Sequence, residues 1–242
     1  MNVSLIPYIV LILMGAAWGL SIPLTKITVS TGYGQFGLIF WQFVIAAIVL
    51  GFVLVVRRKR PLFERKTILL FIVLALLGTI FPNSASYVAT YYLPASFIAI
   101  LIATVPMFSF PIAMLMGLEK KDFRRISGLF IGLLGVVILT APEASFPDRH
   151  LLIFIPLALL APFFYAIEGN YVDKYGTAGQ DPIQTFTGAS ILGTFMILPV
   201  TISTGQWIDP FQPWPIENYT HVASSCCHAF AYCAYVWLVS RA

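Results

Sequence analysis

No Asp, Glu, Lys or Arg interrupts residues 67–118, which read TILLFIVLALLGTIFPNSASYVATYYLPASFIAILIATVPMFSFPIAMLMGL. A second uncharged run covers residues 27–56. An α-helix of about 20 mostly apolar residues is long enough to cross the hydrocarbon core of a bilayer. The first run therefore has room for two crossings, with a turn near Leu93-Pro94. These runs predict an integral membrane protein.

The composition agrees with this prediction. The chain is 59% hydrophobic and only 10% charged, whereas soluble domains have about 25% charged residues. Most of the basic residues behind the net charge of +4 lie in two short clusters between apolar runs. We interpret these clusters as topology signals and expect the lipid bilayer, and no nucleic acid, as a partner.

Eight segments are apolar and long enough to be membrane helices. The first lacks the basic region that precedes a secretory signal, so we predict a membrane helix there rather than a cleaved peptide. The predicted fold class is all-α, a polytopic membrane helical bundle of about eight transmembrane helices. The predicted segments are 5–28, 35–56, 67–88, 95–117, 124–141, 151–172, 183–204 and 219–240.

The basic residues also predict the orientation, because cytoplasmic loops retain Lys and Arg. Twelve of the 14 fall on one side of the predicted topology, leaving Lys26 and Arg149. We therefore expect an inner (cytoplasmic) membrane protein whose N-terminus is cytoplasmic.

Seven prolines lie inside or near the ends of the predicted helices. Each lacks a backbone donor and frees a carbonyl group, which in lipid needs a neighbour or a water-lined cavity. A harmless kink is the alternative for any single proline, but together they favour a bundle with a cavity. They are Pro23, Pro82, Pro106, Pro111, Pro156, Pro162 and Pro199.

A weak internal repeat relates helices 1–3 to helices 6–8. Residues 18–26 occupy the position in helix 1 that residues 165–173 occupy in helix 6, and residues 86–91 similarly match 231–236. An offset of five helices requires the two copies to be inverted relative to each other. Inverted repeats place a binding site near the membrane midplane, where the two copies meet.

Residues 93–101 (LPASFIAIL) lead to the sequence VPMF at 105–108, and Gly117-Leu118-Glu119 is followed by Gly128 and Gly135. This pattern resembles the EamA family of the drug/metabolite transporter superfamily, as does Trp18-Gly19 with Lys26. The resemblance implies ten helices in an inverted 5+5 repeat. It also implies secondary transport, with efflux of amino-acid-like compounds favoured. Independently, Gly128, Gly132 and Gly135 predict close helix approach.

The chain departs from the family pattern in two ways. Gln42 stands where many relatives have an arginine, and the sequence ends after the eighth predicted helix, so we expect the last two helices of the repeat to be missing. We expect a first five-helix repeat over 1–141 and an incomplete three-helix repeat over 151–242. A truncated product and a natural short form that needs a partner both remain open.

No enzyme motif emerges from the sequence. Residues 32–37 spell Gly-x-Gly-x-x-Gly, but they join two membrane helices and follow no strand, so a flexible turn is favoured over a dinucleotide site. Cys226, Cys227 and His228 are consecutive on a helix and cannot converge on a metal ion. We therefore expect no enzyme, no cofactor and no metal. Since there is no P-loop, we also expect transport driven by a gradient.

Two charged residues lie within the predicted membrane helices, where a charge costs roughly 2.5–3.5 kcal/mol on insertion scales. Lys26 either reaches the interface or neutralises an anionic substrate group. Glu168 either couples protons or binds an amine, the alternative being a shallow carboxylate paired with Lys174. Glu119 is interpreted as structural, paired with the basic residues Lys120, Lys121 and Arg124.

Polar and aromatic residues on helices 1, 3, 6 and 8 complete the candidate substrate-binding set. Tyr and Trp combine an apolar ring with one hydrogen-bonding atom, which suits amphiphilic metabolites. Packing in the core or at the lipid interface is the alternative for each one. With Lys26 and Glu168, the set comprises Trp18, Asn83, Ser86, Tyr87, Tyr91, Tyr165, Asn170, Tyr232 and Tyr235.

These observations predict a secondary transporter that moves small organic metabolites or drugs by alternating access. Two alternatives remain open. One is a non-transporting membrane scaffold or regulatory protein, and the other is a membrane-embedded lipid-modifying enzyme. A small-molecule substrate is the expected partner, and the sequence leaves a homodimer open.

Overall fold

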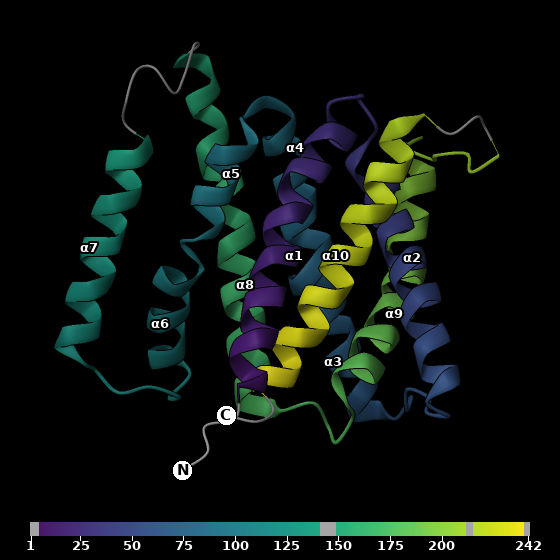
Figure 1. Cartoon of the computed structure of the whole chain (residues 1–242), viewed down its shortest axis with the longest axis horizontal. Coiled ribbons are helices and arrows are strands. Elements are labelled where there is room, and N and C mark those ends of the chain that lie inside the picture. The colour runs from purple at the N-terminus through teal and green to yellow at the C-terminus, as the bar shows by residue number, and fades with distance from the viewer. Residues whose placement is uncertain (1–4, 141–148, 212–214, 240–242) are drawn as a thin grey trace. The chain divides into compact units, whose positions relative to one another are not determined.

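The computed structural model describes the backbone of residues 5–140, 149–211 and 215–239, and the side chains of 5–138, 150–211 and 215–234. Within these ranges all regular secondary structure is helical, and no strand occurs. The all-α fold class is thus confirmed (Figure 1).

A helix occupies each of the eight predicted segments. The first two predicted helices are single α-helices, whereas the third and fourth each consist of two α-helices. The sixth starts with a short 3-10 segment. In chain order the elements are α1 (Ile6–Val29), α2 (Gln35–Val56), α3 (Arg65–Ala75), the π-helical turn η1 (Leu76–Ile80), α4 (Phe81–Tyr92), α5 (Ala95–Ile102), α6 (Val105–Leu115), α7 (Phe123–Thr140), η3 (Arg149–Phe154), α8 (Ile155–Tyr175), α9 (Pro182–Ser203) and α10 (Ile216–Val239).

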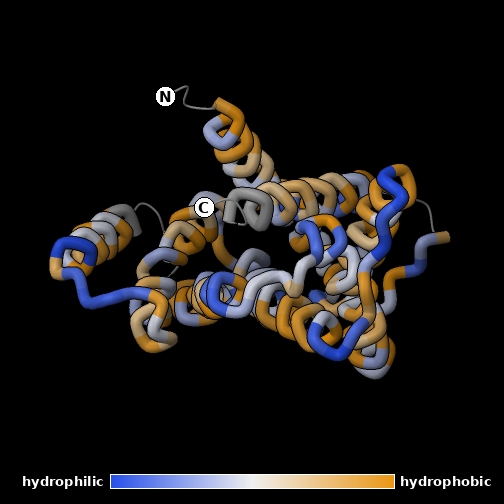
Figure 2. The backbone as a smooth tube through the Cα atoms, turned by 90° about the horizontal axis from the view of Figure 1, so that it is seen from below, coloured by the Kyte–Doolittle hydropathy of each residue, from blue (hydrophilic) through white to orange (hydrophobic). Residues whose placement is uncertain are grey.

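Six helical stretches of the described residues are long and apolar enough to span a membrane. Hydrophobic residues run along the helices, and hydrophilic residues gather at the turns (Figure 2). α7 and α10 are helices but are not among these six, so a count of eight crossings remains a prediction. The six stretches are Ile6–Val29, Gln35–Val56, Arg65–Tyr92, Ala95–Leu115, His150–Tyr175 and Pro182–Ser203.

The predicted prolines fall into two groups. Pro82, Pro106 and Pro156 occupy the first or second position of α4, α6 and α8. Where a separate helix starts, a missing N–H group has no cost, because the first turn leaves its donors unpaired. Pro82 differs, because it directly follows the π-helical turn η1 within the continuous helical stretch Arg65–Tyr92. The other four prolines, Pro23, Pro111, Pro162 and Pro199, lie inside α1, α6, α8 and α9.

The chain forms two compact units, one of residues 1–76 with 177–242 and the other of residues 77–176. The first unit contains α1, α2, α3, α9 and α10, and the second contains α4 to α8. These units are defined by contacts in space. The predicted repeats, 1–141 and 151–242, are defined by similarity along the chain and remain a prediction.

In the first unit, α1 packs along α10, and α9 packs against both α2 and α3 (Figure 1). Hydroxyl groups link α1 to α10: Thr25 Oγ1 lies 2.8 Å from Ser224 Oγ, and Thr28 Oγ1 lies 3.0 Å from Thr220 Oγ1. Such bonds contribute about 0.6 kcal/mol on average in membrane proteins. They connect the two helices at two positions along their lengths.

A glycine sets the distance between α2 and α9. A Cβ atom added to Gly193 would lie 2.5 Å from Cζ of Phe43 and 2.7 Å from both its Cε atoms. The Phe43 side chain is 1% exposed. Gly188 meets the ring of Phe71 in the same way. The two aromatic rings therefore rest directly on the backbone of α9.

Asp181 ties the start of α9 to the loop that precedes α3. Its carboxylate accepts a hydrogen bond from the backbone N–H of Gln184 and forms a 2.8 Å ion pair with Lys59. Burial raises the pKa of Asp181, but the bond from Lys59, the capping bond and neighbouring basic charges outweigh it. The net effect is a pKa below the ordinary value for aspartate.

In the second unit, α4, α5 and α6 pack on α8. Within the described residues, the structure does not place a helix backbone close to Gly128, Gly132 and Gly135 of α7, where close helix approach was predicted. Among described atoms, a Cβ added to Gly128 or Gly135 would meet nothing within 4 Å, and at Gly132 only Cε of Met107 lies near, at 3.1 Å. The close approaches occur on α9 instead, where the glycines face aromatic rings.

Candidate functional site

A buried carboxylate faces the π-helical turn of the second unit. Glu168 of α8 is only 5% exposed, and a Cβ added to Gly78 would lie 2.7 Å from its Oε1 and 2.8 Å from its Cδ. Gly78 is in the middle of η1. Any other residue at this position would displace the carboxylate. π-helical turns within α-helices frequently occur at functional sites.

Three more polar side chains lie on α8 and on α4, the helix that follows η1. Tyr165 is three residues before Glu168, so both lie on one face of α8. The Tyr165 hydroxyl donates to Oδ1 of Asn83 at 3.1 Å, and Asn83 Nδ2 donates to the Tyr87 hydroxyl at 3.5 Å. Asn83 is 3% and Tyr87 5% exposed. We call Gly78, Asn83, Tyr87, Tyr165 and Glu168 the Glu168 cluster.

The Glu168 cluster is a polar site on helices that are otherwise mostly apolar. A charged side chain within a membrane helix costs roughly 2.5–3.5 kcal/mol on insertion scales, and such residues mark pathways for ions and substrates. Two tyrosine hydroxyls and an amide supply both donors and acceptors beside this carboxylate. The arrangement can hold a small polar group or relay a proton.

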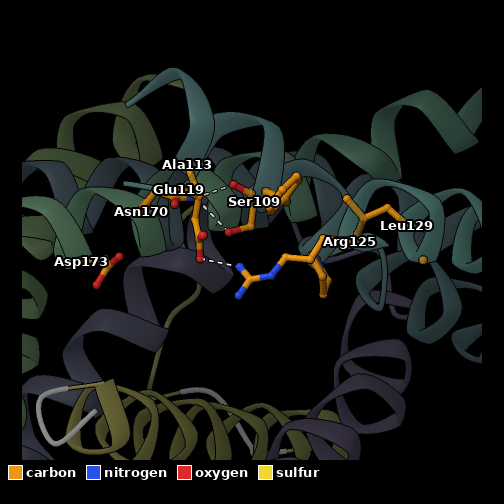
Figure 3. Close-up of a pocket in the computed structure, with 10 residues that line it drawn as sticks. Ser109, Ala113, Glu119, Arg125, Leu129, Asn170 and Asp173 are labelled. Atoms are coloured by element: carbon orange, nitrogen blue, oxygen red, sulfur yellow. Dashed lines mark hydrogen bonds and ion pairs between the residues drawn. The ribbon is translucent and has the colours of Figure 1, made fainter. Parts of the chain in front are cut away.

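A second feature of this unit is a pocket of about 460 Å³. Asn170 anchors it: Nδ2 donates to Oγ of Ser109 at 2.9 Å and to the Ser109 and Ala166 carbonyls at 3.1 and 2.8 Å. The Glu119 and Arg125 side chains point toward one another and form a 2.6 Å ion pair (Figure 3). The lining residues are Pro106, Ser109, Phe110, Ala113, Glu119, Arg125, Gly128, Leu129, Asn170 and Asp173.

The family model described as the EamA-like transporter family matches residues 5–141, more than half of the chain. The chain belongs to this family. The family is part of the drug/metabolite transporter superfamily, which confirms the resemblance found in the sequence. A search of curated proteins finds no match.

The EamA match covers α1 to α7 and therefore three of the five residues of the Glu168 cluster, namely Gly78, Asn83 and Tyr87. Glu168 and Tyr165 lie on α8, beyond the matched residues. Membership in the EamA family, together with six apolar helical stretches, identifies the chain as an integral membrane protein of a transporter family.

The structure brings four predicted site residues of this EamA protein together, namely Asn83, Tyr87, Tyr165 and Glu168. A fifth, Asn170, lines the pocket in the same unit. Ser86 is half-buried on α4. Tyr91 is exposed near the end of α4 and contacts the edge of the Tyr92 ring.

The remaining predicted residues lie in the first unit. Trp18 and Lys26 are partly exposed on α1. The ring of Tyr232 on α10 stacks on Phe186, with ring centroids 4.2 Å apart. Tyr235 also lies on α10, but its side chain is outside the described residues.

Sequence reasoning missed several residues of these sites. Gly78 gives no sequence signal, because a π-helical turn is not readable from an apolar run. Ser109 is a polar residue between Pro106 and Pro111, which could have marked it. In the sequence analysis Asp173 appeared only as the last residue of the repeat segment 165–173 and was not predicted to line a pocket.

Two predicted ion-pair partners differ in the structure. Glu119 pairs with Arg125 instead of the predicted Lys120, Lys121 or Arg124. The reason is the turn before α7, which brings Arg125 back toward Glu119. Lys174, the alternative partner of Glu168, donates to the carbonyl of Met116 at 2.7 Å.

Proposed function

We propose that this EamA protein is a secondary transporter that carries small organic metabolites or drugs across the cytoplasmic membrane. The observation that carries the proposal is the carboxylate of Glu168, buried within a mostly apolar helical stretch against the glycine of a π-helical turn. A group so costly to place in lipid needs a function to account for it. In this proposal Glu168 exchanges a proton or an amine during each transport cycle.

The Glu168 cluster suits a substrate that is partly apolar. Tyr87 and Tyr165 offer ring faces together with hydroxyl groups, and Asn83 adds an amide. Amino-acid-like compounds combine these chemistries, and the family resemblance favours their efflux. We extend the proposal to this substrate class and direction.

Helix pairing supports the proposed inverted repeat. α1 packs along α10 in the first unit, and α4 packs along α8 in the second. In the predicted numbering, α1 is helix 1, α4 belongs to helix 3, α8 belongs to helix 6 and α10 is helix 8. If helix 1 is exchanged for helix 6 and helix 3 for helix 8, the pair α1–α10 becomes the pair α8–α4. The pairing of α2 with α9, the second and seventh helices, is unchanged by that exchange. Such a repeat is the basis of alternating access in secondary transporters.

The experiment is uptake of radiolabelled amino acids into proteoliposomes with an imposed proton gradient. We expect the wild-type chain to accumulate at least one labelled compound. The Glu168→Gln variant should lose accumulation but retain exchange of that compound across the membrane without a gradient. Glu217→Gln, a carboxylate change at the start of α10, serves as the matched control and should accumulate like wild type.

Two results would contradict the proposal. Full gradient-driven accumulation by Glu168→Gln would remove Glu168 from the coupling step. Absence of accumulation and exchange in the folded wild-type protein, across a panel of amino acids, amines and drugs, would favour a non-transporting scaffold instead.

A further inference from the structure

The pocket between α6, α7 and α8 has a fixed pattern of hydrogen-bond acceptors. Asn170 lies at its wall and is 5% exposed. Its Nδ2 lies within hydrogen-bonding distance of three oxygens, of Ser109 and Ala166, so both of its N–H groups are engaged. This bonding sets the orientation of the amide. Its Oδ1 receives no hydrogen bond from the described residues and is therefore the atom left for a ligand.

A carboxylate lies on the same face of α8. Asp173 is three residues after Asn170, a spacing that places two side chains side by side on a helix. Asp173 is exposed and lines the pocket, and among the described side chains it forms no ion pair. Figure 3 places Asp173 and Asn170 on the same side of the pocket. Oδ1 of Asn170 and the Asp173 carboxylate thus form a pair of acceptors.

Among the described residues, one basic group lines the pocket, and it is already engaged. The guanidinium of Arg125 bonds to Glu119 at 2.6 Å and lies 3.9 Å from Asp122 Oδ2. Because the Glu119–Arg125 pair is neutral overall, Asp173 leaves the lining residues with a net charge of −1. An anionic ligand would have to break the pair, whereas a cation can bind without doing so.

We propose that this pocket binds a small organic cation through a primary ammonium group, which donates to the Asp173 carboxylate and to Oδ1 of Asn170. A volume of about 460 Å³ accommodates an amine of the size of one aromatic ring. Phe110 and Leu129 supply apolar surface beside the acceptors. The biological role of this site rests on the proposed function: if the protein is a transporter, cationic amines are a substrate class, and this pocket binds them outside the Glu168 cluster.

The test is calorimetric titration of the full-length protein in nanodiscs of phosphatidylcholine, with empty nanodiscs as a blank. The probes are benzylamine, benzyl alcohol and benzoate, which share one ring and differ in charge. We expect benzylamine to bind and the other two to bind at least about tenfold more weakly, the factor that corresponds to about 1.4 kcal/mol.

Two substitutions should change the affinity in opposite directions. Asp173→Asn should weaken benzylamine binding about tenfold, because a charge-assisted hydrogen bond is lost. Arg125→Gln should strengthen it several-fold, because Glu119 then adds its negative charge to the pocket. A purely structural role for both residues would instead weaken binding in both variants. Glu217→Gln is the matched carboxylate control and should leave the affinity unchanged.

Equal binding of all three probes, or unchanged benzylamine affinity in Asp173→Asn, would overturn the inference. This readout does not require transport. Benzylamine binding without any uptake in proteoliposomes would leave the binding site standing but refute the proposed function and, with it, the role of amines as substrates. Uptake that depends on Glu168, combined with no selective amine binding, would do the reverse.

Discussion

The contact between α2 and α9 can be tested by adding one methyl group. In Gly193→Ala the new Cβ would lie 2.5–2.7 Å from three atoms of the Phe43 ring, whereas carbon atoms in contact are ordinarily about 3.5–4.0 Å apart. The ring is 1% exposed and cannot swing into open space. Either the ring or the helix must therefore move by about 1 Å.

The expected cost follows from two opposing effects. Overpacking of a closed core costs about 1–3 kcal/mol, and the complete burial of Phe43 favours the upper half of that range. Alanine gains about 1 kcal/mol over glycine in helix propensity. The net prediction is a loss of about 1–2 kcal/mol of unfolding free energy. For a chain of this length that corresponds to a decrease of about 2–8 °C in melting temperature.

The assay is thermal unfolding of the detergent-solubilised protein, followed by intrinsic fluorescence. Gly135→Ala is the matched control, because its Cβ would meet no described atom within 4 Å. It should be neutral or stabilised by up to about 1 kcal/mol. The double variant Gly193→Ala with Phe43→Leu should recover part of the loss relative to Phe43→Leu alone, since the smaller side chain leaves space for the methyl group.

The reasoning would be refuted if Gly193→Ala were as stable as wild type or more stable. In that case α2 would not approach the backbone of α9 at this glycine. A loss of equal size in Gly135→Ala would also refute it, because the effect would then belong to glycine in general.

Three further predictions follow from the first unit and from the topology. The lowered pKa of Asp181 means that its stabilising contribution is present above the ordinary aspartate pKa, about 3.9, and is lost as pH falls through the lower folded value. Asp181→Asn, which keeps a capping oxygen, should therefore melt below wild type at pH 7, with the difference shrinking by pH 3. Ser224→Ala removes the 2.8 Å bond to Thr25 and should cost about 0.6 kcal/mol in the same melting assay, and a stabilised variant would contradict the pairing of α1 with α10. In a background without the native cysteines, Arg58→Cys and Lys121→Cys should react with an impermeant thiol reagent from the same side of the membrane, whereas labelling from opposite sides would overturn the predicted topology.

The sequence determined the helices because hydrophobic length is a local property. Each of the eight apolar segments contains helix in the structure, with ends close to the predicted ones. The sequence also marked Glu168, since an acidic residue within an apolar helix is conspicuous without any knowledge of its surroundings. The family resemblance likewise rested on local patterns, and the family match confirmed it.

The tertiary structure alone decided which side chains meet. In a helix that is apolar on every side, hydrophobicity does not distinguish the face that packs on another helix from the face that meets lipid. For this reason the close approaches at Gly188 and Gly193 were not predicted, whereas Gly128 and Gly135 were expected to make them and do not. The position of Gly78 against Glu168 likewise depends on a π-helical turn, which the apolar run does not reveal, and on the packing of α4 against α8, which joins residues distant in the chain.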